Sequence, residues 1–335
     1  MHSLAIDQGG TKTVAILADA EGRILGKGIG AGACHFFDGM PKAMAAVSEA
    51  ANVAFAQAGL TQPDLSPKDL QAISAGMAGA NWPEEIVALE KGLHSLFPVD
   101  NIRVYNDCLI ALRGGTAASR CAVLCAGTGL NAAARFNDEP PFVFNNYIED
   151  LDQGAKGLGT RALSAVFFSE IGGLAPTALT ASALQLFGLD NVDDLLLAWS
   201  RKRLRQPVQD LSPLVFAAAK KSDAVALEII SQFALSISRY PVAAIQKHQA
   251  QNLEVDIVLS GGLFKNRGFS LAETISAQIH RVAPHARIID AAYEPVVGAL
   301  LLALDSKYRQ SIPVAILQNC HASAEKLNLL RTQSQ

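Results

Sequence analysis

The sequence predicts an α/β protein of two lobes, each with the element order β-β-β-α-β-α-β. The main observation is a Gly-Thr turn between two short apolar runs, which occurs once at residues 7–13 and again at residues 126–129. Strand, tight turn and strand are therefore encoded twice. With 335 residues, half of them apolar, the chain is long enough for two lobes with separate cores.

The elements of the first half follow from local patterns. Apolar runs bounded by turn residues predict strands, and Pro at the first helical position or Gly after the last one predicts the limits of a helix. Strands are expected at 4–6, 13–18, 23–28, 70–74 and 102–105, and helices at 41–58, from Pro83 onward, and from Asp107 to Gly114.

The β-turn-β pattern restarts at Arg120, and the second half is richer in helix. We expect strands at 122–124, 131–134, 256–260 and 287–290, and helices at 155–171, 178–187, 192–203, 211–220, 223–249, 268–282 and from Glu294-Pro295 onward. The lobes are expected at 1–116 and 117–304, with a helix from about 305 joining the first lobe. The polar tail from about Arg309 is expected to be loosely held.

Composition excludes several classes of function. Charged residues make up 18% of the chain and the formal net charge is −3, which gives no electrostatic basis for nucleic-acid binding. No apolar run has membrane-spanning length, and the start of the chain has no signal-peptide pattern. The five cysteines lack C-x-x-C spacing, so reduced thiols and a cytoplasmic location are expected.

The two Gly-Thr turns have the chemistry of phosphate-binding loops. Glycine has no Cβ, so backbone N–H groups can approach a phosphate closely, and threonine adds a hydroxyl donor. The residues expected to bind nucleotide phosphates are Gly9, Gly10, Thr11, Lys12 and Thr13 in the first turn and Gly127, Thr128 and Gly129 in the second. The alternative is that each turn only closes a hairpin and that Lys12 is a solvated surface lysine.

The order of five motifs resembles the superfamily of ATP-binding proteins that contains sugar kinases, actin and the heat-shock ATPase chaperones. Residues 7–13 resemble its first phosphate motif, with Gln8 at a usual glycine and Thr13 as the last residue. The other matches are Asn106-Asp107 to the connecting motif, 127–129 to the second phosphate motif, 259–262 to the adenosine motif and 298–300 to the last connecting helix. The resemblance implies two ribonuclease H-like (actin-like ATPase) lobes with a nucleotide cleft between them.

Three further segments resemble the branch of N-acetylglucosamine kinases, glucosamine kinases and the BadF/BadG/BcrA/BcrD ATPases, which activate CoA-ester reductases and dehydratases. These segments are 74–80, 129–131 and 152–155. The resemblance implies sugar contacts by Gly79, Asn131 and Asp152, and by His35, which stands where family members often carry asparagine. A loop or capping role is the alternative for Asp152.

The same resemblance implies the remaining roles. Asp7 would hold Mg²⁺, Asp107 would be the base that accepts the proton of the sugar 6-hydroxyl, and Gly261 and Gly262 would lie against the adenine of ATP. A turn-stabilising acid and a helix N-cap are the alternatives for Asp7 and Asp107.

The expected function is an ATP-dependent hexosamine kinase that makes N-acetylglucosamine 6-phosphate. Glucosamine kinase is the first alternative. An ATPase that activates a redox enzyme is less favoured, because no pair of cluster-ligating cysteines is evident, and an actin-like assembly protein would leave Asp107 and Asp152 without a sugar partner. The helix-rich second half offers surface for a homodimer.

Overall fold

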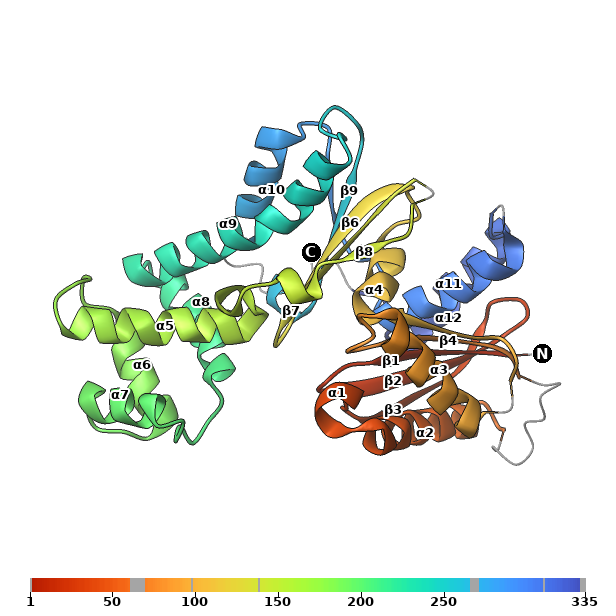
Figure 1. Cartoon of the computed structure of the whole chain (residues 1–335), viewed down its shortest axis with the longest axis horizontal. Coiled ribbons are helices and arrows are strands. Elements are labelled where there is room, and N and C mark those ends of the chain that lie inside the picture. The colour runs from red at the N-terminus through yellow and green to blue at the C-terminus, as the bar shows by residue number, and fades with distance from the viewer. Residues whose placement is uncertain are drawn as a thin grey trace. The chain divides into compact units, whose positions relative to one another are not determined.

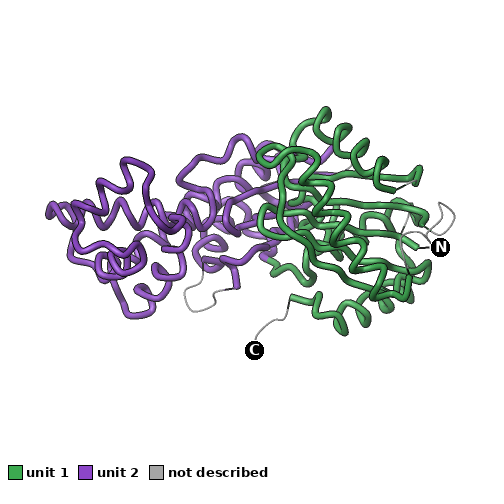
Figure 2. The backbone as a smooth tube through the Cα atoms, turned by 90° about the horizontal axis from the view of Figure 1, so that it is seen from below, with its two compact units in different colours: residues 1–119, 289–335 green, residues 120–288 purple. Residues whose placement is uncertain are grey.

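The computed structural model describes residues 2–60, 70–97, 99–137, 139–265, 271–309 and 311–331. The chain divides into two compact units (Figure 2). Unit 1 contains residues 1–119 and 289–335, and unit 2 contains residues 120–288. The chain therefore leaves unit 1 once and returns to it.

Unit 1 is built on a five-stranded sheet with the strand order β3-β2-β1-β4-β5 (Figure 1). β1 pairs antiparallel with β2 and parallel with β4, so it lies at the centre of the sheet. The strands are β1 (His2–Gln8), β2 (Lys12–Asp19), β3 (Ile24–Ala31), β4 (Leu70–Met77) and β5 (Ile102–Asn106).

Helices cover both faces of this sheet. α2 (Met40–Gln57) and α3 (Pro83–Leu96) pack on one face, and α4 (Asp107–Gly115), α11 (Pro295–Tyr308) and α12 (Val314–Lys326) pack on the other. Alternate residues of β1 enter the two cores: Leu4 and Ile6 face α2, whereas Ala5 faces α11. A strand that is buried on both faces has a nearly continuous apolar sequence, as residues 4–6 of β1 do.

A stripe of glycines explains why β3 lies so close to α2. Gly26, Gly28 and Gly30 alternate along β3, and a Cβ atom at Gly28 would overlap the carbonyl oxygen of Ala50 in α2. Small residues on both elements thus let the helix backbone approach the sheet. This packing accounts for a glycine-rich segment that fits no nucleotide-binding spacing.

Unit 2 repeats the topology of unit 1. Its five-stranded sheet has the order β10-β9-β6-β7-β8, in which β6 pairs antiparallel with β7 and parallel with β9. Its first strand is again central, as β1 is in unit 1. The strands are β6 (Arg120–Ala126), β7 (Leu130–Phe136), β8 (Phe142–Val143), β9 (Asp256–Ser260) and β10 (Arg287–Asp290).

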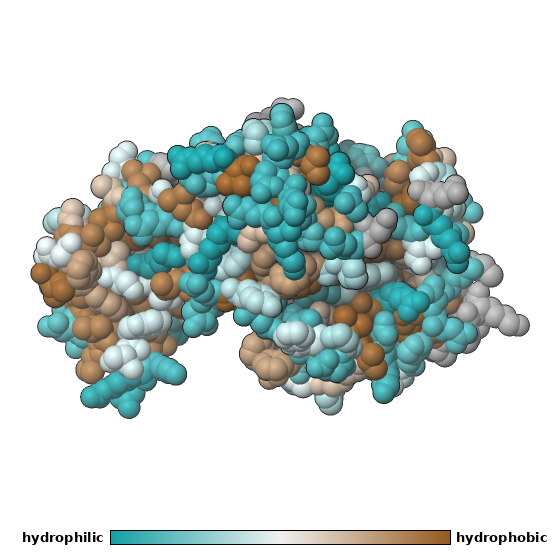
Figure 3. Space-filling model, turned by 45° about the horizontal axis from the view of Figure 1, so that its top comes forward, coloured by the Kyte–Doolittle hydropathy of each residue, from teal (hydrophilic) through white to brown (hydrophobic). Residues whose placement is uncertain are grey.

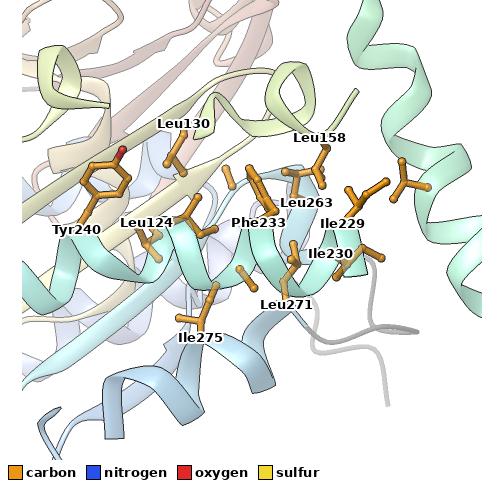
Figure 4. Packing of buried hydrophobic residues seen from close by; sticks show 14 of the residues in the cluster. Leu124, Leu130, Leu158, Ile229, Ile230, Phe233, Tyr240, Leu263, Leu271 and Ile275 are labelled. Carbon is orange, nitrogen blue, oxygen red and sulfur yellow. The ribbon is translucent and has the colours of Figure 1, made fainter. Parts of the chain in front are cut away.

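A helical segment follows β8 in unit 2, where the connection in unit 1 is shorter. Phe233 of the long helix α9 is fully buried in the core of this unit, and Figure 4 shows it among Leu158, Leu263 and Leu271. The helices are α5 (Gly154–Glu170), α6 (Ala178–Phe187), α7 (Val192–Ser200), α8 (Ser212–Lys220), α9 (Ala224–Lys247) and α10 (Leu271–Val282).

The structure confirms the predicted α/β class and every predicted strand and helix, with ends shifted by a few residues; residues 268–270 of one predicted helix lie outside the described part. Among the elements that were missed are α1 (His35–Asp38), β8 and α12. The expectation of a loosely held tail is wrong, because Cys320 and Ala324 of α12 are buried against the sheet of unit 1. The chain returns to unit 1 at 289, before the predicted 305, because α11 packs on β1 and β4.

None of the helices in the described part of the chain is both long and apolar enough to cross a membrane.

The close approach of α2 to β3 gives a first prediction. Gly28→Ala should destabilise the protein by about 2 kcal/mol or more, because overpacking a close contact forces backbone shifts. Thermal unfolding followed by circular dichroism measures this loss. Val53→Ala, on the exposed side of α2, is the matched control. A Gly28→Ala protein as stable as the parent would contradict the packing described here.

Candidate functional site

The carboxyl ends of three parallel strands meet at one edge of unit 1. In the strand register Asp7 of β1 lies opposite Gly76 of β4, and Gly76 lies opposite Tyr105 of β5. The next row contains Gln8, Met77 and Asn106, and Asp107 follows directly. The topology therefore brings the predicted residues Asp7 and Asp107 to the same edge.

Asp7 and Asp107 influence one another electrostatically. Burial, the largest cause, and the negative charge of Asp107 together raise the pKa of the Asp7 carboxyl from 3.8 to about 7. Lys12 opposes this effect, and Glu294, before the first turn of α11, adds a smaller increase. Glu294 was not predicted as a site residue, because only the return of α11 to this sheet brings it near Asp7.

Asn106, rather than Asp107, caps helix α4. The Asn106 Oδ1 accepts a hydrogen bond from the Cys108 N–H at 3.0 Å, and its Nδ2 donates to the Oδ1 of Asn81 at 2.9 Å. Asn106 is 2% exposed, so this amide is a structural link between β5 and the loop after β4. The alternative in which Asp107 is the N-cap is therefore wrong.

The first Gly-Thr turn is a tight hairpin held by its neighbours. The Gly9 N–H donates to the Lys12 carbonyl at 3.0 Å, and the Thr13 hydroxyl donates to the Ala31 carbonyl at 2.7 Å. These two donors are therefore engaged within the protein, and Gly10, Thr11 and Lys12 form the exposed part of the turn.

The segment after β3 packs against this turn. The Ala33 N–H donates to the Gly9 carbonyl at 3.2 Å, and a Cβ atom at Gly32 would overlap the backbone of Gly10 and Thr11. Glycine at 32 is thus required by the close approach of two backbones. The hairpin and the loop that begins with Gly32 form one rigid group.

The same loop brings His35 against Gly79. Gly79 has φ +86°, and a Cβ atom there would lie 2.9 Å from the His35 Cε1 and 3.0 Å from the Cys34 Sγ. Gly79 therefore provides room for the imidazole ring. The Nδ1 of His35 and the Oε1 of Gln8 are buried and have no hydrogen-bond partner within the described residues. An uncompensated buried polar atom is costly, so both atoms suit a polar ligand.

The second Gly-Thr turn, in unit 2, is built in a similar way. The Gly127 N–H donates to the Gly129 carbonyl at 2.9 Å, and Thr128 and Gly129 are exposed. The first amides of α5 secure the turn from behind, since Ala155 donates to Gly127 at 2.9 Å and Lys156 donates to Thr128 at 3.1 Å.

Gly261 lies beside this second turn. Its φ is +102°, and a Cβ atom would overlap the backbone of Ala126, the residue before Gly127. Gly262 begins a short 3-10 helix, and apart from its chain neighbours no atom of the described residues lies within 4 Å of the position that a Cβ would take. Asn131 lies near the start of β7, with its Oδ1 accepting from the Ala132 N–H at 2.8 Å. Unit 2 thus gathers these predicted residues near the ends of β6 and β9.

Asp152 is buried rather than displayed at the surface. It is 1% exposed, and its two oxygens accept hydrogen bonds from Arg161, Arg239 and Tyr240. Its predicted contact with a sugar stays a prediction.

No cluster of three or more His, Cys, Asp or Glu side chains suited to a metal ion occurs in the described residues. A Mg²⁺ ion prefers oxygen ligands and commonly keeps several waters while binding one or two carboxylates and substrate phosphates. The carboxylates of Asp7 and Asp107 fit this way of binding Mg²⁺. A cation would offset both causes of the raised Asp7 pKa, which are burial and the charge of Asp107.

Comparison with known proteins gives consistent results. The sequence pattern described as the BadF/BadG/BcrA/BcrD ATPase family matches residues 4–303. The chain is 25% identical to an N-acetyl-D-glucosamine kinase of Dictyostelium discoideum, over 91% of this chain and 98% of that protein. It is 26% identical to the glucosamine kinase GspK of Vibrio cholerae, over 73% and 81% of the two chains.

A crystal structure from Chromobacterium violaceum, of a candidate N-acetylglucosamine kinase, has the same fold. It superposes with a TM-score of 0.70 at 23% identity, over 90% of this chain and 98% of the other.

The raised pKa of Asp7 predicts how stability depends on pH. Because the folded-state pKa, about 7, exceeds the ordinary value of 3.8, the folded protein binds more protons between these limits. Its stability should therefore fall as pH rises from about 4 to about 7. Asp7→Asn should be more stable than the parent at pH 8, by about 1.4 kcal/mol for each unit of pKa shift removed, and nearly equal to it at pH 4.

Thermal unfolding of both proteins across this pH range measures the difference. Asp100→Asn, which removes an exposed carboxylate from unit 1, is the control. An Asp7→Asn variant that matches the parent at pH 8 would contradict the proposed burial of an ionised Asp7.

Proposed function

The chain belongs to the BadF/BadG/BcrA/BcrD ATPase family, and from this we propose that it is an ATP-dependent hexosamine kinase. The proposed acceptor is the 6-hydroxyl of N-acetylglucosamine, with glucosamine as the alternative. The observation that carries the proposal is the placement of Asp107 beside Asp7 at one strand edge, with the His35–Gly79 loop in the same unit. The similarity to amino-sugar kinases over most of the chain supports it.

Phosphoryl transfer requires a positioned acceptor, neutralised phosphate charge and an in-line approach. In this proposal Asp107 accepts the proton of the sugar 6-hydroxyl as that oxygen bonds to the γ-phosphorus. The bond between the γ-phosphorus and the bridging oxygen breaks, and ADP leaves with its electrons. Asp107 suits the role because Asn106 performs the capping of α4 in its place.

The exposed parts of the two turns are the proposed phosphate ligands. In unit 1 these are Gly10, Thr11 and Lys12, and in unit 2 they are Thr128 and Gly129. Gly9, Thr13 and Gly127 shape the turns through their own hydrogen bonds. Gly261 and Gly262 are proposed to lie against the adenine. Asp7 would hold Mg²⁺, which when bound neutralises phosphate charge.

The proposed sugar contacts are His35 and Asn131, with Gly79 shaping the pocket of His35. For Asp152 a sugar contact is the alternative to a structural role, because its oxygens already accept hydrogen bonds from Arg161, Arg239 and Tyr240. The unpartnered Nδ1 of His35 can donate or accept, depending on its tautomer, so it can bind a hydroxyl or an acetamido oxygen. The Gln8 Oε1 is a further acceptor that the sequence did not indicate as a sugar contact.

Kinetics with a panel of amino sugars, ATP and Mg²⁺ tests this function. We expect the highest kcat/KM with N-acetylglucosamine and one sugar phosphate formed for each ADP. A preference for glucosamine would shift the assignment to the alternative. ATP hydrolysis that no sugar stimulates, together with stoichiometric iron and sulfide, would instead indicate an ATPase activator.

The role of Asp107 gives a separate prediction. Asp107→Asn should lower kcat by about 10²- to 10⁴-fold, the usual contribution of a general base. Nucleotide affinity, measured by calorimetry, should change little, because Asp107 is not proposed to bind phosphate. Turnover equal to that of the parent would exclude the base assignment.

We also propose that the chain forms a homodimer through α7. Leu196 and Leu197 of this helix are 46% and 47% exposed, and Figure 3 shows hydrophobic residues gathered over the helical end of unit 2, at the left of the view. Asp193 lies one turn before Leu197 and Arg201 one turn after it, both exposed. A second copy of α7 running antiparallel would pair Asp193 with Arg201 twice around the leucines, which is the symmetry of a two-fold interface.

Leu197→Glu should therefore convert a dimer to a monomer in light scattering after size-exclusion chromatography, because it places like charges at the two-fold axis. Leu253→Glu, at an exposed leucine elsewhere in unit 2, should leave the dimer intact. A parent protein that is monomeric at micromolar concentration would refute the proposal.

A further inference from the structure

We propose that Asp152, Arg161, Arg239 and Tyr240 form an ionic clasp that positions the second Gly-Thr turn of unit 2 for nucleotide binding. The four side chains are thus positioning residues that act through the backbone of the turn. The inference rests on the proposed function only in that this turn binds nucleotide phosphates.

The clasp is centred on a buried carboxylate with three partners. The Asp152 Oδ1 lies 3.2 Å from the Arg161 Nη2, and the Oδ2 lies 2.8 Å from the Arg239 Nη2 and 2.9 Å from the Tyr240 hydroxyl. Asp152 is 1% exposed, so its charge depends on these groups for compensation. Removing one partner of a buried charge is far more damaging than removing a surface ion pair.

The same partners fix the backbone around Asp152. The Tyr240 hydroxyl accepts a hydrogen bond from the Glu149 N–H at 3.2 Å, and the Arg161 Nε donates to the Leu151 carbonyl at 3.2 Å. Arg239 also pairs with the Glu149 carboxylate at 3.1 Å. Residues 149–152 are thereby tied both to α5, through Arg161, and to α9, through Arg239 and Tyr240.

The residues that follow the clasp make the contacts with the turn. The Gln153 Oε1 accepts from the Leu130 N–H at 3.3 Å, directly after Gly129. Gly154 has φ +46°, and a Cβ atom there would overlap the carbonyls of Gly127 and Gly129. Ala155 and Lys156 then donate to carbonyls of the turn, as described above.

The direction of these hydrogen bonds explains how the position of the turn would affect nucleotide binding. The carbonyls of Gly127 and Thr128 accept bonds from α5, so they point toward the helix. The exposed side of the turn is then free to present N–H groups, which is what an anion requires. Any displacement of residues 149–152 moves the start of α5 and with it the turn.

This arrangement distinguishes the clasp from a direct sugar contact. A sugar-binding Asp152 needs no particular role for Tyr240, whose hydroxyl is buried between Asp152 and Glu149. In the clasp, Tyr240 and Arg239 matter as much as Asp152 does. The conservative change Tyr240→Phe, which removes one hydroxyl, therefore separates the two roles.

Calorimetry with a non-hydrolysable ATP analogue and Mg²⁺, without sugar, is the first measurement. Tyr240→Phe and Arg239→Gln should each weaken nucleotide binding by about tenfold, because each removes a hydrogen bond to the buried Asp152 carboxylate. The KM for sugar should change less than twofold. Tyr147→Phe, at an exposed tyrosine before the clasp, should change neither value.

Amide hydrogen exchange is the second measurement, and it does not depend on any activity. In Tyr240→Phe the amides of Leu130, Ala155 and Lys156 should exchange faster, while those of β1 in unit 1 should not. Unchanged exchange and nucleotide affinity in a folded Tyr240→Phe protein would overturn the clasp. A raised sugar KM in Asp152→Asn with unchanged nucleotide affinity would assign Asp152 to the sugar instead. If the parent protein binds no nucleotide but the exchange result holds, the proposed function fails and the positioning role survives.

Discussion

The main constraint in unit 1 is a carboxylate, Asp7, that the fold holds away from water. β1 lies at the centre of its sheet with helices on both faces, and its alternating side chains place Ala5 and Asp7 on the face that α11 covers. Asp7, near the end of β1, is therefore partly buried, and the negative charge of Asp107 raises its pKa. Such an arrangement opposes folding at neutral pH, and a cation with nucleotide phosphates is the ligand that would relieve it.

Each unit supports its Gly-Thr turn with a glycine from the segment that follows its third strand. In unit 1 this is Gly32, after β3, and in unit 2 it is Gly154, after β8. A side chain at either position would collide with the backbone of the turn. The two units thus share a strand order and also the same means of fixing a phosphate-type turn, although the supporting segments differ in length and sequence.

Much of this arrangement could be predicted from sequence, because the determining signals are local. Asp7, the two turns and Asp107 stand at the ends of apolar runs. Within the sheet of unit 1, parallel strands bring Asp7 and Asp107 to one edge. The structural roles of Thr13 and Asp152 could not be predicted, because their partners Ala31, Arg239 and Tyr240 are distant in sequence. The proximity of Glu294 to Asp7 and the packing of α12 depend on the return of the chain to unit 1, which no local pattern encodes.

The central claim is that Asp7 and Asp107 share one site whose charge a Mg²⁺–nucleotide complex neutralises. The most direct test is an NMR titration of the Asp7 carboxyl carbon in protein carrying ¹³C-labelled aspartate, assigned with Asp7→Asn. The account predicts titration of Asp7 near pH 7 in the free protein, and at lower pH in Asp107→Asn or with Mg²⁺ and an ATP analogue. An Asp7 that titrates near pH 4 under all three conditions would contradict it.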